Sequence, residues 1–281
     1  MSVLVLGLFG GLCVGSFLNV VIHRFPRMLE QRWRDDVFLL DHPDELLPER
    51  PAYNLAVPRS ACPHCGHRIR WYENIPLASW LALRGRCSAC AAPISVRYPL
   101  VELATGLLTV LVVHLLGVQW MTLAALLLTW SLIALTMIDY DTQLLPDDIT
   151  LPLLWLGLLV AIPAGGVSTE DALIGAAAGY LTLWSIYWLF RIATGKEGMG
   201  YGDFKLLAAL GAWLGWQDLP LVIVLSSGVG AVLGIAMIVV AGRDRAKPIP
   251  FGPFLAIAGF IAYLWGDALL DGPLQLLRLT G

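Results

Sequence analysis

The sequence predicts an all-α polytopic membrane protein of about eight transmembrane helices, with one small polar module inserted after the first helix. Hydrophobic residues make up 58% of the 281 residues and charged residues only 14%, whereas about one quarter of the residues in soluble domains are charged. A single aqueous core cannot bury this much apolar surface, so a lipid bilayer must solvate a large part of the chain. The eleven tryptophans suit a protein that is anchored at two membrane interfaces.

Apolar runs locate the expected spans, because about 20 residues of helix cross the hydrocarbon core. The expected spans are Ser2–Ile22, Tyr98–Leu116, Trp120–Ile138, Ile149–Ala164, Ala172–Phe190, Phe204–Trp216, Leu219–Ala241 and Phe254–Leu270. The Phe204–Trp216 run is the weakest, since it is short for a span and a re-entrant helix would fit it equally well. The expected organisation is a first transmembrane helix (residues 1–22), a cytoplasmic module (23–97) and a transmembrane bundle (98–281).

The basic residues set the expected orientation. Of the 18 lysines and arginines, eleven are arginines between His23 and Arg97, and six more lie in Arg191–Lys205 and Arg243–Lys247. An eight-span topology places all of these on one side of the membrane and leaves only Arg278 for the other. The positive-inside rule assigns the richer side to the cytoplasm. We therefore expect both termini outside and the long arginine-rich segment in the cytoplasm.

Two CxxC pairs lie in the polar module. They are Cys62-Pro-His-Cys65 and Cys87-Ser-Ala-Cys90, with 21 residues between them. Four thiolates at this spacing can close a tetrahedral Zn²⁺ site of the ribbon type. A reducing cytosol argues against the alternative of two disulfides. We expect a structural zinc that folds a zinc-ribbon-like segment too polar and too small to build its own core.

Three residues in or beside the first cysteine pair, and the fifth cysteine of the chain, are not expected to bind the metal. His64 and His67 could replace a cysteine as ligands, but they are more simply surface residues. Gly66 directly follows the first pair, where a knuckle turn often needs a positive φ. Cys13 lies in the first apolar run, so we expect a small packed hydrophobic residue there rather than a reactive thiol.

Two aspartates lie at the edges of apolar runs. Asp139 directly follows one run and Asp203 directly precedes another. A carboxylate in the bilayer centre costs about 2.5–3.5 kcal/mol, so an acidic residue at membrane depth is first interpreted as functional. The expected topology places both on one membrane face. Two close carboxylates would share a proton and supply a general base and a general acid, which is the equipment that activates water on a peptide carbonyl.

Helix capping and solvation are the alternative roles for the acidic residues. Asp147 or Asp148 follows a proline and is expected to be the N-cap of the next helix. Asp141 can be a solvated loop acid, and Asp203 could equally cap its own helix. Asp139 follows the end of a helical run, which is the unfavourable end of the helix dipole for a structural carboxylate. This misfit favours a functional role for Asp139.

Taken together, the motifs resemble those of the type IV prepilin leader peptidases, also called prepilin peptidase/N-methyltransferases, which serve type IV pilus and type II secretion systems. The resemblance extends over essentially the whole chain. It includes Gly15-Ser-Phe-Leu-Asn-Val-Val-Ile-His-Arg24, the two cysteine pairs, Arg97-Tyr-Pro-Leu-Val-Glu102, the segment from Asp139 to Leu145-Pro-Asp147, and Gly200-Tyr-Gly-Asp203. The last is the GxGD signature, which is specific only in combination with the others.

The resemblance implies an aspartyl protease of the bacterial inner membrane whose active site faces the cytoplasm. Members cut prepilins and type II secretion pseudopilins after the glycine that ends a short basic leader, and then methylate the new N-terminal residue with S-adenosylmethionine. The catalytic pair carries over to Asp139 and Asp203. The expected partners are these substrates and the lipid bilayer, with no nucleic acid. No residue can be assigned to the methyl donor, because no glycine-rich loop follows a strand.

Two other classes remain open. Another intramembrane GxGD protease, similar to presenilin or to signal peptide peptidases, would lack the methyltransferase activity, but those proteases have no CxxC module. A transporter with a zinc-ribbon domain would need inverted repeats or helices broken at the midplane, and the sequence shows neither.

Overall fold

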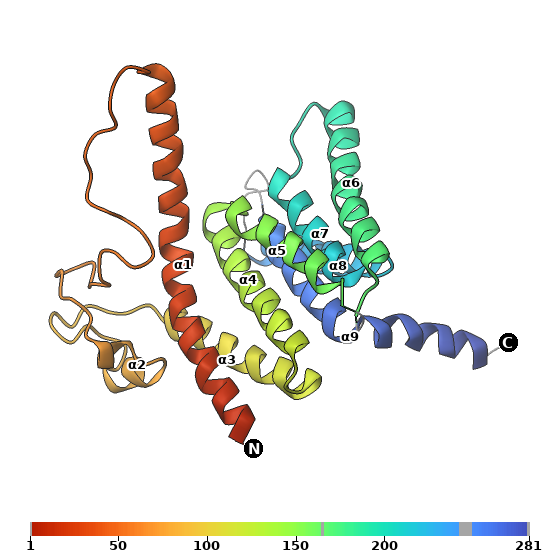
Figure 1. The fold of residues 1–281 in the computed structure, drawn as a ribbon, viewed down its shortest axis with the longest axis horizontal. Coiled ribbons are helices and arrows are strands. Elements are labelled where there is room, and N and C mark those ends of the chain that lie inside the picture. The colour runs from red at the N-terminus through yellow and green to blue at the C-terminus, as the bar shows by residue number, and fades with distance from the viewer. Residues whose placement is uncertain (1, 164–165, 242–248, 280–281) are drawn as a thin grey trace. The chain divides into compact units, whose positions relative to one another are not determined.

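The fold is almost entirely helical. The structure is a computed structural model that describes residues 2–163, 166–241 and 249–279, and within these ranges it holds no strand, only two isolated β-bridges. The elements are α1 (Ser2–Asp41), the 3₁₀ helix η1 (Trp71–Asn74), α2 (Ala78–Ala82), α3 (Arg97–Leu116), α4 (Trp120–Thr142), α5 (Asp147–Val160), α6 (Thr169–Thr194), α7 (Tyr201–Leu214), α8 (Leu219–Ala241) and α9 (Gly252–Leu279) (Figure 1). The expected fold class is confirmed.

Among the residues that the structure describes, five helices are long and apolar enough to cross a membrane. They are α1, α3, α4, α6 and the described part of α9. A helix also stands at each of the three other expected spans. However, α5 and α7 have 14 residues each, or about 21 Å at 1.5 Å per residue, which is shorter than a hydrocarbon core of about 30 Å. Arg243, Arg245 and Lys247, which are expected on the cytoplasmic side, lie outside the described residues.

The chain divides into two compact units, Met1–Val118 and Gln119–Gly281. In the first unit, α1 packs along α3 (Figure 1). Gly11 and Gly15 make this possible, because a Cβ at either position would lie within 3 Å of the α3 backbone. Glycines four residues apart share one helix face and let two helices approach closely.

Helix α1 continues well past the expected end of the first span. It runs through Pro26 to Asp41, so the arginine-rich segment begins as helix rather than as loop. A proline inside a helix removes one backbone hydrogen bond, yet the helix persists on both sides of it. Cys13 lies on an exposed face of α1. The expectation that Cys13 packs inside the protein is therefore wrong. Gly11 and Gly15 form the side of α1 that contacts α3, and Cys13 lies on a different side.

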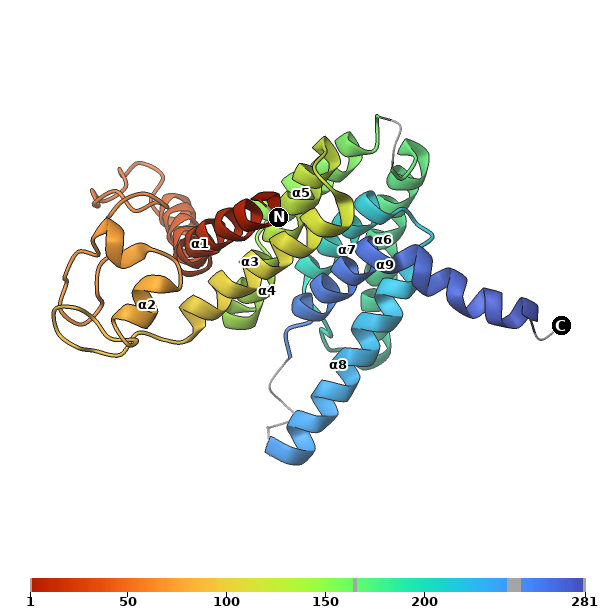
Figure 2. The same ribbon diagram turned by 90° about the horizontal axis from the view of Figure 1, so that it is seen from below.

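In the second unit, α7 lies among α5, α6 and α9 (Figure 2). Every residue from Leu206 to Leu214 is buried. At Gly175 of α6 and Gly211 of α7, the two backbones come so close that neither position has room for a Cβ. The apolar character of α7 therefore reflects burial inside protein, which also explains why so short a helix is so apolar.

Candidate active site and metal centre

Asp139 lies in the last turn of α4 and is almost completely buried, with 5% of its surface exposed. The chain leaves the helix at Gln143, which adopts a left-handed conformation and donates its N–H to the Asp139 carbonyl. The Asp139 side chain accepts a hydrogen bond of 3.0 Å from the backbone N–H of Gly252. Gly252 is the first residue of α9. A segment more than a hundred residues further along the chain therefore holds this carboxylate.

Asp203 lies in the first turn of α7 and is also buried, with 7% of its surface exposed. Gly200 is the N-cap of this helix. The alternative that Asp203 is the capping residue is therefore wrong. The position inside the first turn is still favourable, because backbone N–H groups at a helix N-terminus stabilise negative charge.

Leu145 lies beside two glycines that neighbour the aspartates in the fold. A Cβ added to Gly202, the neighbour of Asp203, would lie 2.7 Å from the Leu145 Cβ. A Cβ added to Gly252, which binds Asp139, would lie 3.1 Å from the Leu145 Cδ2. Asp139 and Asp203 are close enough for their charges to interact. The fold thus brings the two carboxylates into one buried site.

Aromatic side chains brace the start of α7. The buried Tyr187 ring lies 5.3 Å from the Tyr201 ring and 5.6 Å from the Phe204 ring, measured between centroids. Tyr201 and Phe204 lie two residues before and one residue after Asp203 in α7. Arg191 donates a hydrogen bond of 3.0 Å to the Tyr187 hydroxyl. The end of α6 therefore supports the helical turn that carries Asp203.

Asp147 and Asp148 do not cap α5. Pro146 is the N-cap, and the two aspartates occupy the first turn. The expectation of an N-cap aspartate is wrong because Pro146 already has the extended conformation of a cap position. Asp147 instead accepts two hydrogen bonds of 2.7 Å from Lys205, one at each carboxylate oxygen. This ion pair ties the start of α5 to the start of α7.

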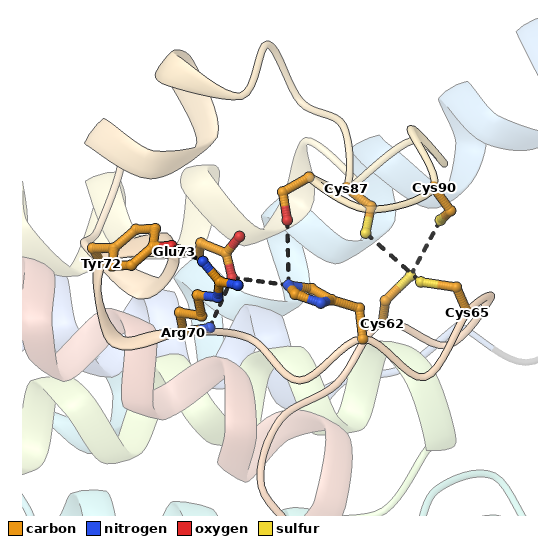
Figure 3. A network of polar contacts seen from close by, with 9 residues as sticks. Cys62, Cys65, Arg70, Tyr72, Glu73, Cys87 and Cys90 are labelled. Carbon is orange, nitrogen blue, oxygen red and sulfur yellow. Dashed lines mark hydrogen bonds and ion pairs between the residues drawn. The ribbon is translucent and has the colours of Figure 1, made fainter.

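In the first unit, the four cysteine sulfur atoms converge (Figure 3). They all lie within 4.8 Å of one another and could hold a metal ion. The Cys62 and Cys90 sulfurs are 3.8 Å apart, and the Cys65 and Cys87 sulfurs 4.0 Å apart. A tetrahedron with metal–sulfur bonds of about 2.3 Å has edges of about 3.8 Å. All four cysteines are free, so the alternative of two disulfides does not apply to this structure.

The two knuckles have the same backbone geometry. A β-bridge flanks each one, between Ala61 and Arg68 and between Arg86 and Pro93. Gly66 has a φ of +71°, as expected, and Ala91 has a φ of +57° at the equivalent position of the second knuckle.

The knuckle backbone also prepares the thiols for metal binding. Backbone N–H groups of His64 and Cys65 donate to the Cys62 sulfur and lower the pKa of this thiol to about 7. Backbone N–H groups of Cys90 and Ala89 lower the pKa of Cys87 in the same way. The first cysteine of each knuckle therefore favours the thiolate form that binds metals. Cys65 differs, because a backbone hydrogen bond from His67 is outweighed by burial and by hydrogen bonds with the other three thiols, which raise its pKa to about 12.

His67 is not a plain surface residue. Its Nε2 atom lies 3.2 Å from the Glu73 carboxylate and 3.3 Å from the Ser88 hydroxyl. Hydrogen bonds from Ser88 and from the Arg70 N–H hold the pKa of Glu73 at about 2. The Glu73 and Ser88 contacts share one ring nitrogen, so this is no Ser–His–acid relay, in which the two partners bind opposite nitrogens. The network ties the two knuckles together (Figure 3).

Two family models match adjacent parts of the chain. Residues 9–116 match the bacterial peptidase A24 N-terminal domain, and residues 126–235 match the type IV leader peptidase family. The chain is 64% identical to a prepilin leader peptidase/N-methyltransferase of Aeromonas hydrophila, over 92% of this chain and 89% of that protein. The chain belongs to the type IV leader peptidase family. Proteins of the same name from Stutzerimonas stutzeri and Pseudomonas aeruginosa are 60% and 58% identical, over 96% and 94% of this chain and 93% and 91% of theirs. No solved structure matches the chain.

In this leader peptidase, sequence reasoning did not find two partners of the site. Gly252 carried no signal, because a backbone N–H donor is the same in every residue except proline. Leu145 is an ordinary apolar residue. The run Pro250-Phe-Gly-Pro253 could have drawn attention, since proline and glycine together mark an unusual start to a helix.

Proposed function

We propose that this protein cleaves the short basic leader of type IV prepilins and type II secretion pseudopilins after glycine, and then methylates the new N-terminal residue. The active site faces the cytoplasm at a bacterial inner membrane. The names of the close relatives support both activities. The observation that carries the proteolytic part is the buried pair Asp139 and Asp203, from α4 and α7, whose neighbouring glycines Gly252 and Gly202 both lie beside Leu145.

The two aspartates act as a dyad that shares one proton. The ionised carboxylate takes a proton from water as this water attacks the scissile carbonyl carbon, and the protonated carboxyl gives its proton to the carbonyl oxygen. When the tetrahedral intermediate collapses, the now ionised carboxylate takes a proton from one hydroxyl of the gem-diol and the C–N bond breaks. The leaving nitrogen takes the proton held by the other carboxyl, which returns the dyad to its one-proton state. Burial from bulk water strengthens these charge interactions.

Two further groups complete the proposal. The four cysteines hold one structural Zn²⁺, since their sulfurs have the separations of a tetrahedral site and the ion would supply folding energy to the module. S-adenosylmethionine, when bound, supplies the methyl group for the new N-terminal amine. The seventeen basic residues expected on one face support the cytoplasmic orientation.

The test is a membrane assay with a model prepilin, read by mass for cleavage and for one added methyl group. Asp139→Asn and Asp203→Asn should each lower the cleavage rate by about 10²–10⁴-fold or more, because asparagine cannot exchange the proton. Both variants should still methylate a pre-cleaved pilin. Near wild-type cleavage by either variant, at a normal level in the membrane, would exclude the aspartyl mechanism. Cleavage by the unmodified protein without methylation would favour a GxGD protease that lacks the second activity.

A further inference from the structure

We propose that Gly252 is a positioning residue of the peptidase site, which holds the Asp139 carboxylate through its N–H and makes room for it by having no side chain. This inference rests on the proposed function, because it gives Gly252 a role in the chemistry assigned to Asp139. It adds a third segment of the chain, the start of α9, to a site that the sequence motifs place on two.

The hydrogen bond fixes the orientation of the carboxylate. The Gly252 N–H donates to Asp139 Oδ2 over 3.0 Å in a buried place. The first N–H groups of a helix have no partner within their own helix, so α9 can offer this donor without losing a bond of its own. Rotation of a carboxylate about its last side-chain bond is soft. A single donor on one oxygen therefore decides how the group faces Asp203.

The start of α9 also offsets an unfavourable position. Asp139 lies in the last turn of α4, where the helix dipole disfavours negative charge. Gly252 opens α9, and the N-terminal end of that helix favours negative charge. The misfit of Asp139 within its own helix is thus compensated by a helix that the chain supplies much later.

Space, rather than backbone conformation, requires a glycine at this position. Gly252 is not among the residues with positive φ, so other residues could adopt its backbone. A Cβ at this position, however, would lie 2.6 Å from Asp139 Oδ2 and 3.1 Å from Leu145 Cδ2. The nearer atom is the end of a movable side chain. An added methyl group would therefore displace the carboxylate rather than disrupt the fold.

Two substitutions separate the two parts of this role. Gly252→Ala adds a Cβ and keeps the N–H, whereas Gly252→Pro adds a Cβ and removes the N–H. Proline is well tolerated at the first position of a helix. The matched control is Gly228→Ala in α8, where a Cβ would meet no atom within 4 Å. Asp139→Asn in the same membranes serves as the reference for the aspartyl chemistry.

We expect Gly252→Ala to lower kcat for cleavage by about tenfold, and Gly252→Pro to lower it by about tenfold more, as loss of a hydrogen bond to a charged group predicts. KM should stay within about twofold, and methylation of a pre-cleaved pilin should not change. Gly228→Ala should cleave like the unmodified protein.

Three results would overturn the inference. Wild-type kcat in both Gly252 variants would exclude any role in positioning. Equal losses in both variants would exclude the role of the N–H. A parallel loss of cleavage, methylation and membrane level would mean that Gly252 only supports folding. If Asp139→Asn itself cleaves normally, the proposed function fails, whatever the Gly252 variants do.

Discussion

The cluster of four cysteines and the aspartate site are assembled in opposite ways. Each cysteine knuckle is a short local turn, and both knuckles repeat one backbone geometry with bridges on either side. The aspartate site draws on α4, on the segment before α5, on α7 and on α9, and its hydrogen bond between Asp139 and Gly252 spans 113 positions of the sequence. The first site is largely local in the chain, and the second depends on the packing of a whole helical unit.

This difference determines how each site should respond to change. A local metal site depends on its ion, because the segment around it buries little apolar surface and metal binding supplies its folding energy. The surroundings of the aspartates are buried throughout α7, so the scaffold should survive the loss of either carboxylate. Substitutions at the cysteines should therefore disturb structure, whereas those at the aspartates should disturb chemistry.

The largest expected effect is the loss of the metal. Cys62→Ser should release the ion, whose binding free energy in such sites is about 10–16 kcal/mol, and should abolish order in residues 59–93. Hydrogen exchange followed by mass spectrometry should show fast exchange there and unchanged protection in α7. Metal analysis should find about one zinc per chain before the change. Slow exchange of residues 59–93 in metal-free protein would show that this segment folds without its ion.

The next effect concerns whether the two aspartates act as a unit. Asp139→Asn and Asp203→Asn should each cost about 10²–10⁴-fold in kcat, and the double variant should be no slower than the slower single one, since neither carboxylate works without the other. The assay is single-turnover cleavage of a model prepilin in vesicles. Multiplied losses in the double variant would indicate two independent roles instead of a shared proton.

A smaller effect tests the repeated geometry of the knuckles. Ala91 has a positive φ of +57°, which costs an L-residue about 1–2 kcal/mol. Ala91→Gly should therefore strengthen zinc retention against a chelator by about fivefold. Gly66→Ala should weaken it by a similar factor, because nothing lies within 4 Å of the added Cβ and only the φ of +71° opposes it. Changes of the same sign in both variants would contradict this interpretation.

The smallest effect concerns the ion pair between Asp147 and Lys205. Their side chains are 52% and 28% exposed, and exposed pairs of this kind contribute about 0–1 kcal/mol. Asp147→Lys or Lys205→Asp should lower the cleavage rate by at most about fivefold, and the double exchange should restore it. The ratio of the four rates gives the coupling between the two residues. A double variant slower than both single ones would show that the pair does not align α5 with α7 through its charge.

The sequence by itself determined where the apolar helices lie, where the four cysteines cluster and to which family the protein belongs. Its apolar runs located a helix at each expected span, although α5 and α7 are too short to cross a hydrocarbon core and α1 extends unexpectedly to Asp41. The cysteine spacing predicted the cluster, and the GxGD signature in combination with the other motifs predicted the family. These features are readable because each depends on residues that are close in the chain, where spacing alone sets the geometry.

Only the tertiary structure decided what surrounds the aspartates. It placed Leu145 between Gly202 and Gly252, turned the expected cap residue Asp147 toward Lys205, and aimed a backbone N–H at Asp139. It also showed that α7 is apolar because protein surrounds it. None of these relations has a local pattern in the sequence. A buried carboxylate is satisfied by whichever donor the packing of distant helices brings to it, and that donor can be the backbone of any residue except proline.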